Sequence, residues 1–377
     1  MKLKTKVLMV VGTRPEAIKM APLVLEFQKR KSEFQPLLCS TGQHRQMLDQ
    51  VFATFGLQPD FELNIMTPGQ TLAQVTARAA EGLDKVFETA RPDIVLVQGD
   101  TTSAFVGALI GHYHRVAVGH IEAGLRTGDK FAPFPEEMNR RLVTRLADWH
   151  FPPTDFARNT LVSEGVDPCR VFVTGNTVID ALLLTRSKVR QKPPELPKAI
   201  VDIFSNNRVV LITGHRRESF GTGFENICRA LLRASDADPD VSFVYPMHLN
   251  PNVREPVERI LSGQPRIHLI EPLSYEPFVW MMDKSALVLT DSGGVQEEAP
   301  ALGKPVLVMR DTTERPEGIE AGNALLVGTS EDGIHDNLCR LLNDPAICEA
   351  MARIRNPYGD GTAARQTVDI LSTNFSD

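Results

Sequence analysis

The chain has 377 residues, 42% hydrophobic and 23% charged, and this length predicts two domains rather than one hydrophobic core. The formal net charge of −6 argues against a nucleic-acid-binding protein, which needs an excess of basic residues. No apolar run approaches the roughly 18 residues of a membrane-spanning helix, and five dispersed cysteines without CxxC spacing predict reduced thiols in a cytoplasmic protein.

Short apolar runs alternate with amphipathic stretches along the chain. Runs that are apolar throughout are typical of parallel strands covered on both faces. The expected strands are 7–11, 35–39, 94–97, 116–120, 171–174, 209–213, 241–245, 267–270, 286–290 and 306–309. Helical stretches such as 21–31, 70–88 and 225–234 fall between them. This rhythm predicts a doubly wound α/β fold.

A proline-rich segment and an internal similarity indicate how the chain divides. Residues 188–197 carry three prolines and interrupt the rhythm. The Gly-Thr-Arg-Pro-Glu sequence at 12–16 resembles Gly-His-Arg-Arg-Glu at 214–218, and each ends the first strand of its half. Two Rossmann-like halves would explain the similarity, and so would chance. We expect an N-terminal domain of residues 1–175, rejoined by a C-terminal helix at 361–377, and a second domain of residues 176–360.

Neither half contains the G-x-G-x-x-G sequence that binds dinucleotides. Arg14 stands where the second glycine belongs, which argues against a bound NAD. The Asp-Ser-Gly-Gly sequence at 291–294 suits a nucleotide diphosphate instead, because paired glycines admit a ligand to the backbone and a helix N-terminus attracts phosphate. Glu297 or Glu298 could accept hydrogen bonds from ribose hydroxyls. An ordinary turn with an Asp or Ser side-chain N-cap explains this loop equally well.

Charged residues follow six of the expected strands, where ligands bind in open α/β sheets. A single charged residue at a strand end is best explained as a solvated loop charge or a helix cap. Charged residues at six strand ends together indicate a ligand-binding site. These residues are Arg14, Lys19, Asp100, Glu122, Arg126, the His-Arg-Arg-Glu run at 215–218, the Ser-Gly-Gly loop at 292–294, Arg310, Asp311 and Arg315.

Neighbouring carboxylates suit acid–base chemistry. Asp100 and Glu122 are the first candidates, and Glu136 with Glu137 are the next, although an acidic helix start after proline also explains the second pair. His112 and His114 have a metal-like spacing but lack a third ligand motif, so we expect no metal.

Taken together, the motifs resemble those of the bacterial non-hydrolysing UDP-N-acetylglucosamine 2-epimerases, from Lys6 to about Ala363. The motifs that carry the resemblance are Gly-Thr-Arg-Pro-Glu-Ala-Ile-Lys at 12–19, Gln-Gly-Asp-Thr-Thr at 98–102, Gly-His-Ile-Glu-Ala-Gly-Leu-Arg-Thr at 119–127, Thr-Gly-Asn at 174–176, Gly-His-Arg-Arg-Glu at 214–218, Asp-Ser-Gly-Gly-Val-Gln-Glu-Glu at 291–298 and Arg-Asp-Thr-Thr-Glu-Arg-Pro-Glu at 310–317. The resemblance implies two Rossmann-like domains with parallel sheets facing a cleft, the glycosyltransferase-B architecture. It also implies reversible conversion of UDP-N-acetylglucosamine to UDP-N-acetylmannosamine for cell-envelope polysaccharide synthesis, no cofactor, and a homodimer.

The resemblance also assigns roles to residues. The residues that would hold UDP are Arg14, His215, Leu273, Phe278, Ser292, Gly293, Gly294, Glu298 and Arg315. Those that would face the sugar are Lys19, Asp100, Glu122 and Glu136. The last three are the acid–base candidates, and which of them takes the proton and which donates one stays open. His215 joins them in the catalytic set. Some family members carry a second, regulatory substrate site, for which the candidates are Gln43, Gln46 and His248.

The implied reaction needs no hydride acceptor, in keeping with the missing dinucleotide sequence. The hydrogen on C2 of the sugar is not acidic, so UDP must first leave C1 before a carboxylate takes that proton and a glycal forms. UDP then adds back while a proton arrives from the opposite face. A retaining glycosyltransferase, a hydrolysing epimerase and a non-catalytic sugar-nucleotide sensor are the alternatives.

Overall fold

The computed structural model describes residues 4–42 and 45–374. The chain forms two compact units. Unit 1 runs to Ala181 and resumes at Tyr358, and unit 2 comprises Leu182–Pro357. The first boundary therefore falls inside helix α7 (Thr177–Gln191), and the second falls between Pro357 and Tyr358. No helix in the described ranges is both long and apolar enough to cross a membrane.

Unit 1 contains a six-stranded sheet in the order β3-β2-β1-β4-β5-β6, with every pair of neighbours parallel. Its strands are β1 (Thr5–Val11), β2 (Phe34–Ser40), β3 (Phe61–Glu62), β4 (Ile94–Gln98), β5 (Ala117–Ile121) and β6 (Trp149–Phe151). Its helices are α1 (Arg14–Lys29), α2 (Arg45–Phe55), α3 (Leu72–Ala90), α4 (Thr102–Tyr113), α5 (Glu136–Leu146), α6 (Asp155–Ser163) and α16 (Ala363–Asn374), with the start of α7. Side chains 7–11 of β1 are fully buried between these layers, as the unbroken apolar run predicts.

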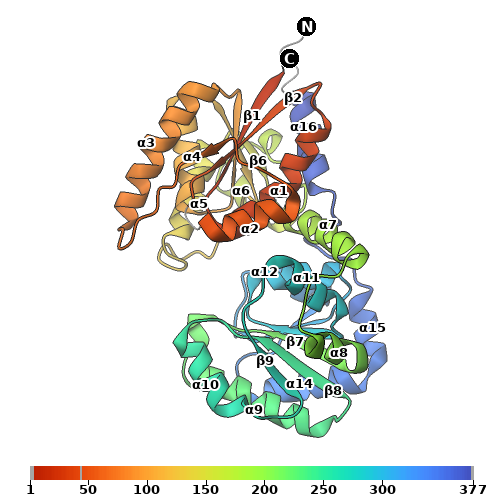
Figure 1. Cartoon of the computed structure of the whole chain (residues 1–377). Helices are drawn as coiled ribbons and strands as arrows, with labels where there is room; N and C mark the ends of the chain where they lie inside the picture. The colour runs from red at the N-terminus through yellow and green to blue at the C-terminus, as the bar shows by residue number, and fades with distance from the viewer. Residues whose placement is uncertain (1–3, 43–44, 375–377) are drawn as a thin grey trace. The chain divides into compact units, whose positions relative to one another are not determined.

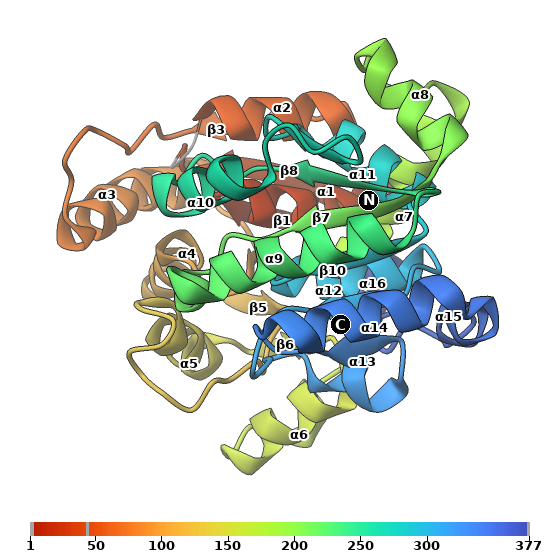
Figure 2. The same cartoon turned by 90° about the horizontal axis from the view of Figure 1, so that it is seen from below.

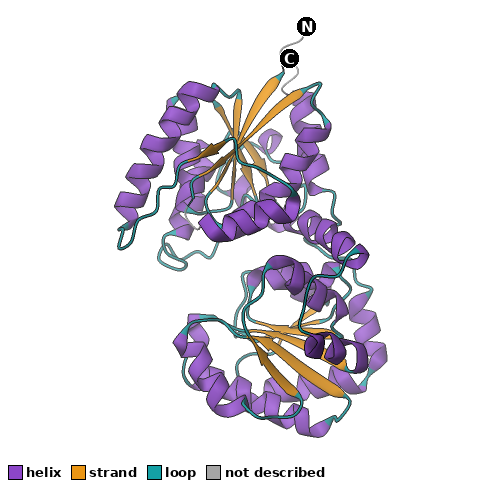
Figure 3. Ribbon diagram, viewed as in Figure 1, coloured by secondary structure: helices purple, strands orange, loops and turns teal. Residues whose placement is uncertain are grey.

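Unit 2 repeats this plan with the order β12-β11-β10-β7-β8-β9, again with parallel neighbours. Its strands are β7 (Arg208–Thr213), β8 (Val241–Pro246), β9 (Ile267–Ile270), β10 (Leu287–Thr290), β11 (Val306–Val308) and β12 (Ala324–Leu326). Its helices are α8 (Lys198–Asn206), α9 (Thr222–Ala237), α10 (Pro251–Leu261), α11 (Tyr275–Lys284), α12 (Gly293–Ala301), α13 (Pro316–Ala321), α14 (Glu331–Asn343) and α15 (Pro345–Ala352), with the rest of α7. Figure 3 shows the strands as the middle layer of each unit, and Figure 2 shows α9 and α14 side by side in unit 2.

The expected α/β class with two Rossmann-like units is confirmed. In each sheet the strand order reverses beside the first strand of the unit, between β1 and β4 and between β7 and β10. Ligands of such sheets bind beyond the carboxyl ends of the strands at this reversal. The similar sequences at 12–16 and 214–218 both lie there, each after the first strand of its unit.

Some expectations about strands were wrong. The segment 171–174 is not a strand, and only Val171 forms a bridge, to His150. Its neighbour β6 has just three residues, so there is little strand for a longer segment to pair with. The sequence also failed to indicate β3, β6 and β12, which lie at sheet edges and have two or three residues each.

The C-terminal helix belongs to unit 1. Figure 1 shows α16 in blue beside α1 in red-orange, and Arg30 at the end of α1 makes an ion pair with Asp369 at 2.5 Å. Asp180 of α7 accepts hydrogen bonds from the amides of Ala363 (3.2 Å) and Ala364 (2.9 Å), the first two residues of α16. A buried carboxylate therefore satisfies the start of the last helix.

Candidate active site

Glu122 is the most constrained carboxylate of unit 1. It directly follows β5, is buried, and has a backbone φ of +61°, a left-handed conformation that few residues other than glycine adopt. The Lys19 ammonium of α1 and the Gln98 amide at the end of β4 both donate to its carboxylate. Such strain clusters at functional sites, where the surrounding structure holds it in place.

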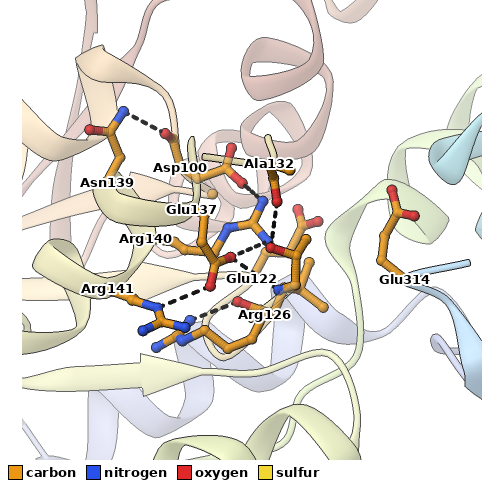
Figure 4. Close-up of polar contacts among 12 residues, drawn as sticks. Asp100, Glu122, Arg126, Ala132, Glu137, Asn139, Arg140, Arg141 and Glu314 are labelled. Carbon is orange, nitrogen blue, oxygen red and sulfur yellow. Dashed lines mark hydrogen bonds and ion pairs between the residues drawn. The ribbon is translucent and has the colours of Figure 1, made fainter. Parts of the chain in front are cut away.

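Asp100 lies one strand away, in the loop after β4. Its carboxylate forms an ion pair with Arg140 of α5, and its backbone carbonyl accepts a hydrogen bond from the Asn139 amide at 2.9 Å (Figure 4). The preceding residue, Gly99, has a φ of +68°, and its carbonyl lies 2.8 Å from His120 Nε2. Burial lowers the pKa of His120 to about 3, so its neutral ring donates to this carbonyl from Nε2.

Glu136 and Glu137 have different environments. Helix α5 begins at Glu136, directly after Pro135, so the helix start that the sequence indicated is confirmed. Glu137 is fully buried and accepts hydrogen bonds from the Thr127 amide (3.1 Å) and from Arg141 Nε (3.0 Å). Glu136 is half-buried, and its side chain makes no hydrogen bond or ion pair with the residues that the structure describes.

Glu16 is a buried carboxylate whose importance the sequence did not indicate. One oxygen accepts from the Gly12 amide (3.0 Å), the Thr13 amide (2.7 Å) and the Thr13 hydroxyl (2.8 Å). The other accepts from the Thr101 hydroxyl at 2.6 Å. Glu16 therefore links the β1–α1 loop to the residue that follows Asp100. Burial raises the pKa of Glu16 despite these donors. An acidic residue at the third position of a helix after threonine is the signal for this bonding.

In unit 2, the Ser-Gly-Gly loop opens α12 without a side-chain cap. Ser292 is the N-cap residue and makes no capping hydrogen bond among the residues described. Asp291 is also not a cap, because its buried carboxylate accepts from the backbone amides of His215 (2.7 Å) and Arg216 (2.8 Å). The proposed side-chain N-cap is therefore wrong. Asp291 joins the loop after β7 to the loop after β10 and leaves the first amides of α12 to another acceptor.

Two guanidinium groups lie at the start of α12. A Cβ atom on Gly293 would be 3.6 Å from an Arg216 side-chain nitrogen and 3.8 Å from Arg315 Cζ. Arg216 also contacts Glu314 at 3.2 Å, and Arg315 forms an ion pair with Glu297. Burial alone would raise the pKa of Glu314, but the arginines around it lower the pKa to about 2. Cationic groups and free helix amides together suit a phosphorylated ligand.

His215 lies at the same loop. Its ring stacks on His248 with 5.5 Å between ring centroids, and its Nδ1 lies 3.4 Å from Asp291 Oδ1. Burial lowers the pKa of His215, and the negative charge of Asp291 opposes this shift only in part. The imidazole is therefore mainly neutral at pH 7 and can donate one hydrogen bond.

The remaining predicted residues lie on separate elements. Arg14 and Lys19 lie on α1 of unit 1, and Gln46 is exposed on α2. In unit 2, Phe278 of α11 and Leu273 before it are half-buried, Glu298 of α12 accepts from the Tyr275 hydroxyl at 3.1 Å, and His248 is exposed. Gln43 lies outside the described residues. Within the described ranges, no group of three or more His, Cys, Asp and Glu side chains is arranged to hold a metal ion.

Comparisons with known proteins give one consistent result. The family model for UDP-N-acetylglucosamine 2-epimerase matches residues 26–372. The UDP-N-acetylglucosamine 2-epimerase of Escherichia coli strain K12 is 53% identical over 372 residues, which cover 98% of this chain and 99% of the relative. The crystal structure of the Neisseria meningitidis UDP-GlcNAc 2-epimerase bound to UDP-GlcNAc has a TM-score of 0.89 at 48% identity and covers 98% of this chain and 100% of that one.

A more distant structure has the same fold. The Methanocaldococcus jannaschii UDP-GlcNAc 2-epimerase in complex with UDP-GlcNAc and UDP has a TM-score of 0.80 at 31% identity, with 98% of this chain and 100% of that chain covered. Fold, family model and near full-length identity agree. The chain belongs to the UDP-N-acetylglucosamine 2-epimerase family.

Proposed function

We propose that this enzyme interconverts UDP-N-acetylglucosamine and UDP-N-acetylmannosamine by eliminating UDP to a glycal and adding it back. What supports this above all is the pair of carboxylates after neighbouring strands of the first sheet. Asp100 follows β4 and Glu122 follows β5, and each is held by a cation from a helix. The Neisseria meningitidis relative, whose structure contains UDP-GlcNAc, supports the choice of substrate.

Unit 2 would hold the UDP. The amides at the start of α12 have no side-chain cap among the described residues, and ion pairs with Glu314 and Glu297 hold the guanidinium groups of Arg216 and Arg315. Fixed dipoles and cations stabilise charge that develops on a leaving group without reorganising. Asp291 beside Nδ1 of His215 leaves Nε2 as the nitrogen that would face a phosphate oxygen.

Unit 1 would supply the proton transfers. The hydrogen on C2 becomes removable only as UDP departs from C1, because the positive charge that develops there weakens the neighbouring C–H bond. One carboxylate among Asp100, Glu122 and Glu136 would take this proton, and another would deliver a proton to the opposite face. Hydrogen bonds from Lys19 and Gln98 hold the Glu122 carboxylate in a fixed position. We further propose a cytoplasmic homodimer that serves cell-envelope polysaccharide synthesis.

One experiment tests this function. The protein is incubated with UDP-N-acetylglucosamine in heavy water, without added NAD or metal, and the mixture is followed by proton NMR. We expect UDP-N-acetylmannosamine with deuterium at C2, and deuterium at C2 of the recovered substrate. Free N-acetylmannosamine as the main product would indicate a hydrolysing enzyme instead. Tight UDP binding without turnover would indicate a sensor, and transfer of the sugar to an added acceptor would indicate a glycosyltransferase.

A further inference from the structure

Helix α5 contacts the loop that carries Asp100 at two points. The Asn139 amide donates to the backbone carbonyl of Asp100 at 2.9 Å, and the Arg140 guanidinium pairs with its carboxylate (Figure 4). The first contact fixes the main chain and the second fixes the side chain. The same helix begins with Glu136, so one rigid element carries one acid–base candidate and holds another.

Arg140 is itself held in place. Its side chain is only 11% exposed, and one terminal nitrogen lies 3.5 Å from the fully buried carboxylate of Glu137. Glu137 is fixed in turn by the Thr127 amide, and by Arg141, as Figure 4 shows. The guanidinium therefore lies between a buried carboxylate that anchors it and a partly exposed one that it positions. One terminal nitrogen pairs with Asp100 and the other lies beside Glu137, an arrangement that a lysine ammonium, with its single nitrogen, cannot reproduce.

We propose that Arg140 is a positioning residue for the reaction, which keeps the Asp100 carboxylate in one orientation toward the sugar. The inference rests on the proposed function. A proton transfer requires the carboxylate oxygen to lie within hydrogen-bond reach of the proton, and small misplacements of such groups lower rates strongly. Arg140 is not among the residues proposed to hold UDP, so the affinity for UDP should not depend on it.

The test compares Arg140→Gln, Arg140→Lys and a matched control, Arg145→Gln. Arg145 lies on the same helix and bonds the Glu164 carbonyl at 2.8 Å, away from Asp100. We expect Arg140→Gln to lower kcat by about 10- to 100-fold, a part of what a general acid–base group contributes. We expect KM and the Kd for UDP to change by less than about threefold. Arg140→Lys should recover part of kcat because it keeps the charge, and Arg145→Gln should stay within about twofold of wild type.

A double variant separates positioning from general damage. If Arg140 acts through Asp100, then Arg140→Gln should cost nothing further in an Asp100→Asn background, because the two losses are not additive. A full additional loss there, or a kcat for Arg140→Gln equal to that of Arg145→Gln, would overturn the proposal. If Arg140→Gln fails to fold by thermal melting, Arg140→Lys carries the same comparison. Absence of C2 deuterium with the wild-type enzyme would contradict the proposed function instead, so the two failures are distinguishable.

Discussion

Replacing Gly293 with alanine should leave the fold intact or strengthen it, and should weaken UDP binding. Gly293 is the first residue of α12, and the nearest atoms to an added Cβ lie 3.6 Å away, an ordinary contact distance. Alanine in a helix is more stable than glycine by up to about 1 kcal/mol. The new methyl group would nevertheless project toward Arg216, Arg315 and the Glu314 carboxylate between them, where the proposed function puts the diphosphate.

The size of the binding loss follows from the contact that the methyl group displaces. A hydrogen bond to a charged group contributes about 1.5–3 kcal/mol, so losing one backbone–phosphate bond should raise the Kd for UDP by about 10- to 100-fold. Calorimetric titration with UDP and thermal melting measure the two effects separately. Gly223→Ala is the control, because Gly223 lies in the first turn of α9 and an added Cβ would be 3.5 Å from its nearest neighbour, Ser219 Cβ. A Kd for Gly293→Ala within twofold of wild type would refute this reasoning.

Three further predictions concern single carboxylates. Asp100→Asn should keep UDP affinity and lose about 100-fold or more in turnover, and activity within a factor of two of wild type would show that the acid–base assignment is wrong. Glu16→Ala should destabilise the protein by about 3–6 kcal/mol in urea unfolding, because the buried amide of Gly12 and the partly buried donors of Thr13 and Thr101 lose their acceptor. Glu16→Gln, which keeps the shape, should cost less than half of this, and equal costs would contradict the role of the hydrogen bonds. Burial raises the pKa of Asp180 from 3.8 to about 6, partly opposed by the α16 amides. The folded state therefore binds this proton more tightly than the unfolded state. The contribution of protonated Asp180 to the free energy of unfolding is fully present below about pH 4 and is lost as the pH rises through 6. The difference in unfolding free energy between wild type and Asp180→Asn should fall by up to about 3 kcal/mol between pH 4 and pH 7. A difference that does not change with pH would contradict the raised pKa of Asp180.

The sequence predicted the central strands and the loops that carry the site for a physical reason. Strands β1, β4, β7 and β10 are covered on both faces, so their sequences are unbroken apolar runs that end abruptly at polar residues. Those polar residues include Asp100, His215 and Ser292, and their position at strand ends follows from the parallel topology alone. Short edge strands such as β3 leave no comparable signal.

Contacts between distant segments were not predictable. Arg140 looks like any helix-surface cation in the sequence, and only the packing of α5 against the loop after β4 brings it to Asp100. Glu136 and Glu137 are adjacent and chemically alike, yet helical geometry turns Glu137 inward to Arg140 and Arg141 while Glu136 stays half-buried. Such differences depend on tertiary direction, which a single sequence does not contain.

The return of the chain to unit 1 affects how the protein is made. The sheet of unit 1 is translated before Leu182–Pro357, but its helix α16 is translated after the whole of that segment. At about 5–20 residues per second, the intervening stretch takes roughly 10–40 s to synthesise. During that time the face of α1 that α16 covers remains exposed, and the Asp180 carboxylate has no helix amides from which to accept hydrogen bonds. Unit 2 can therefore finish folding before unit 1, which must wait for α16 to be made.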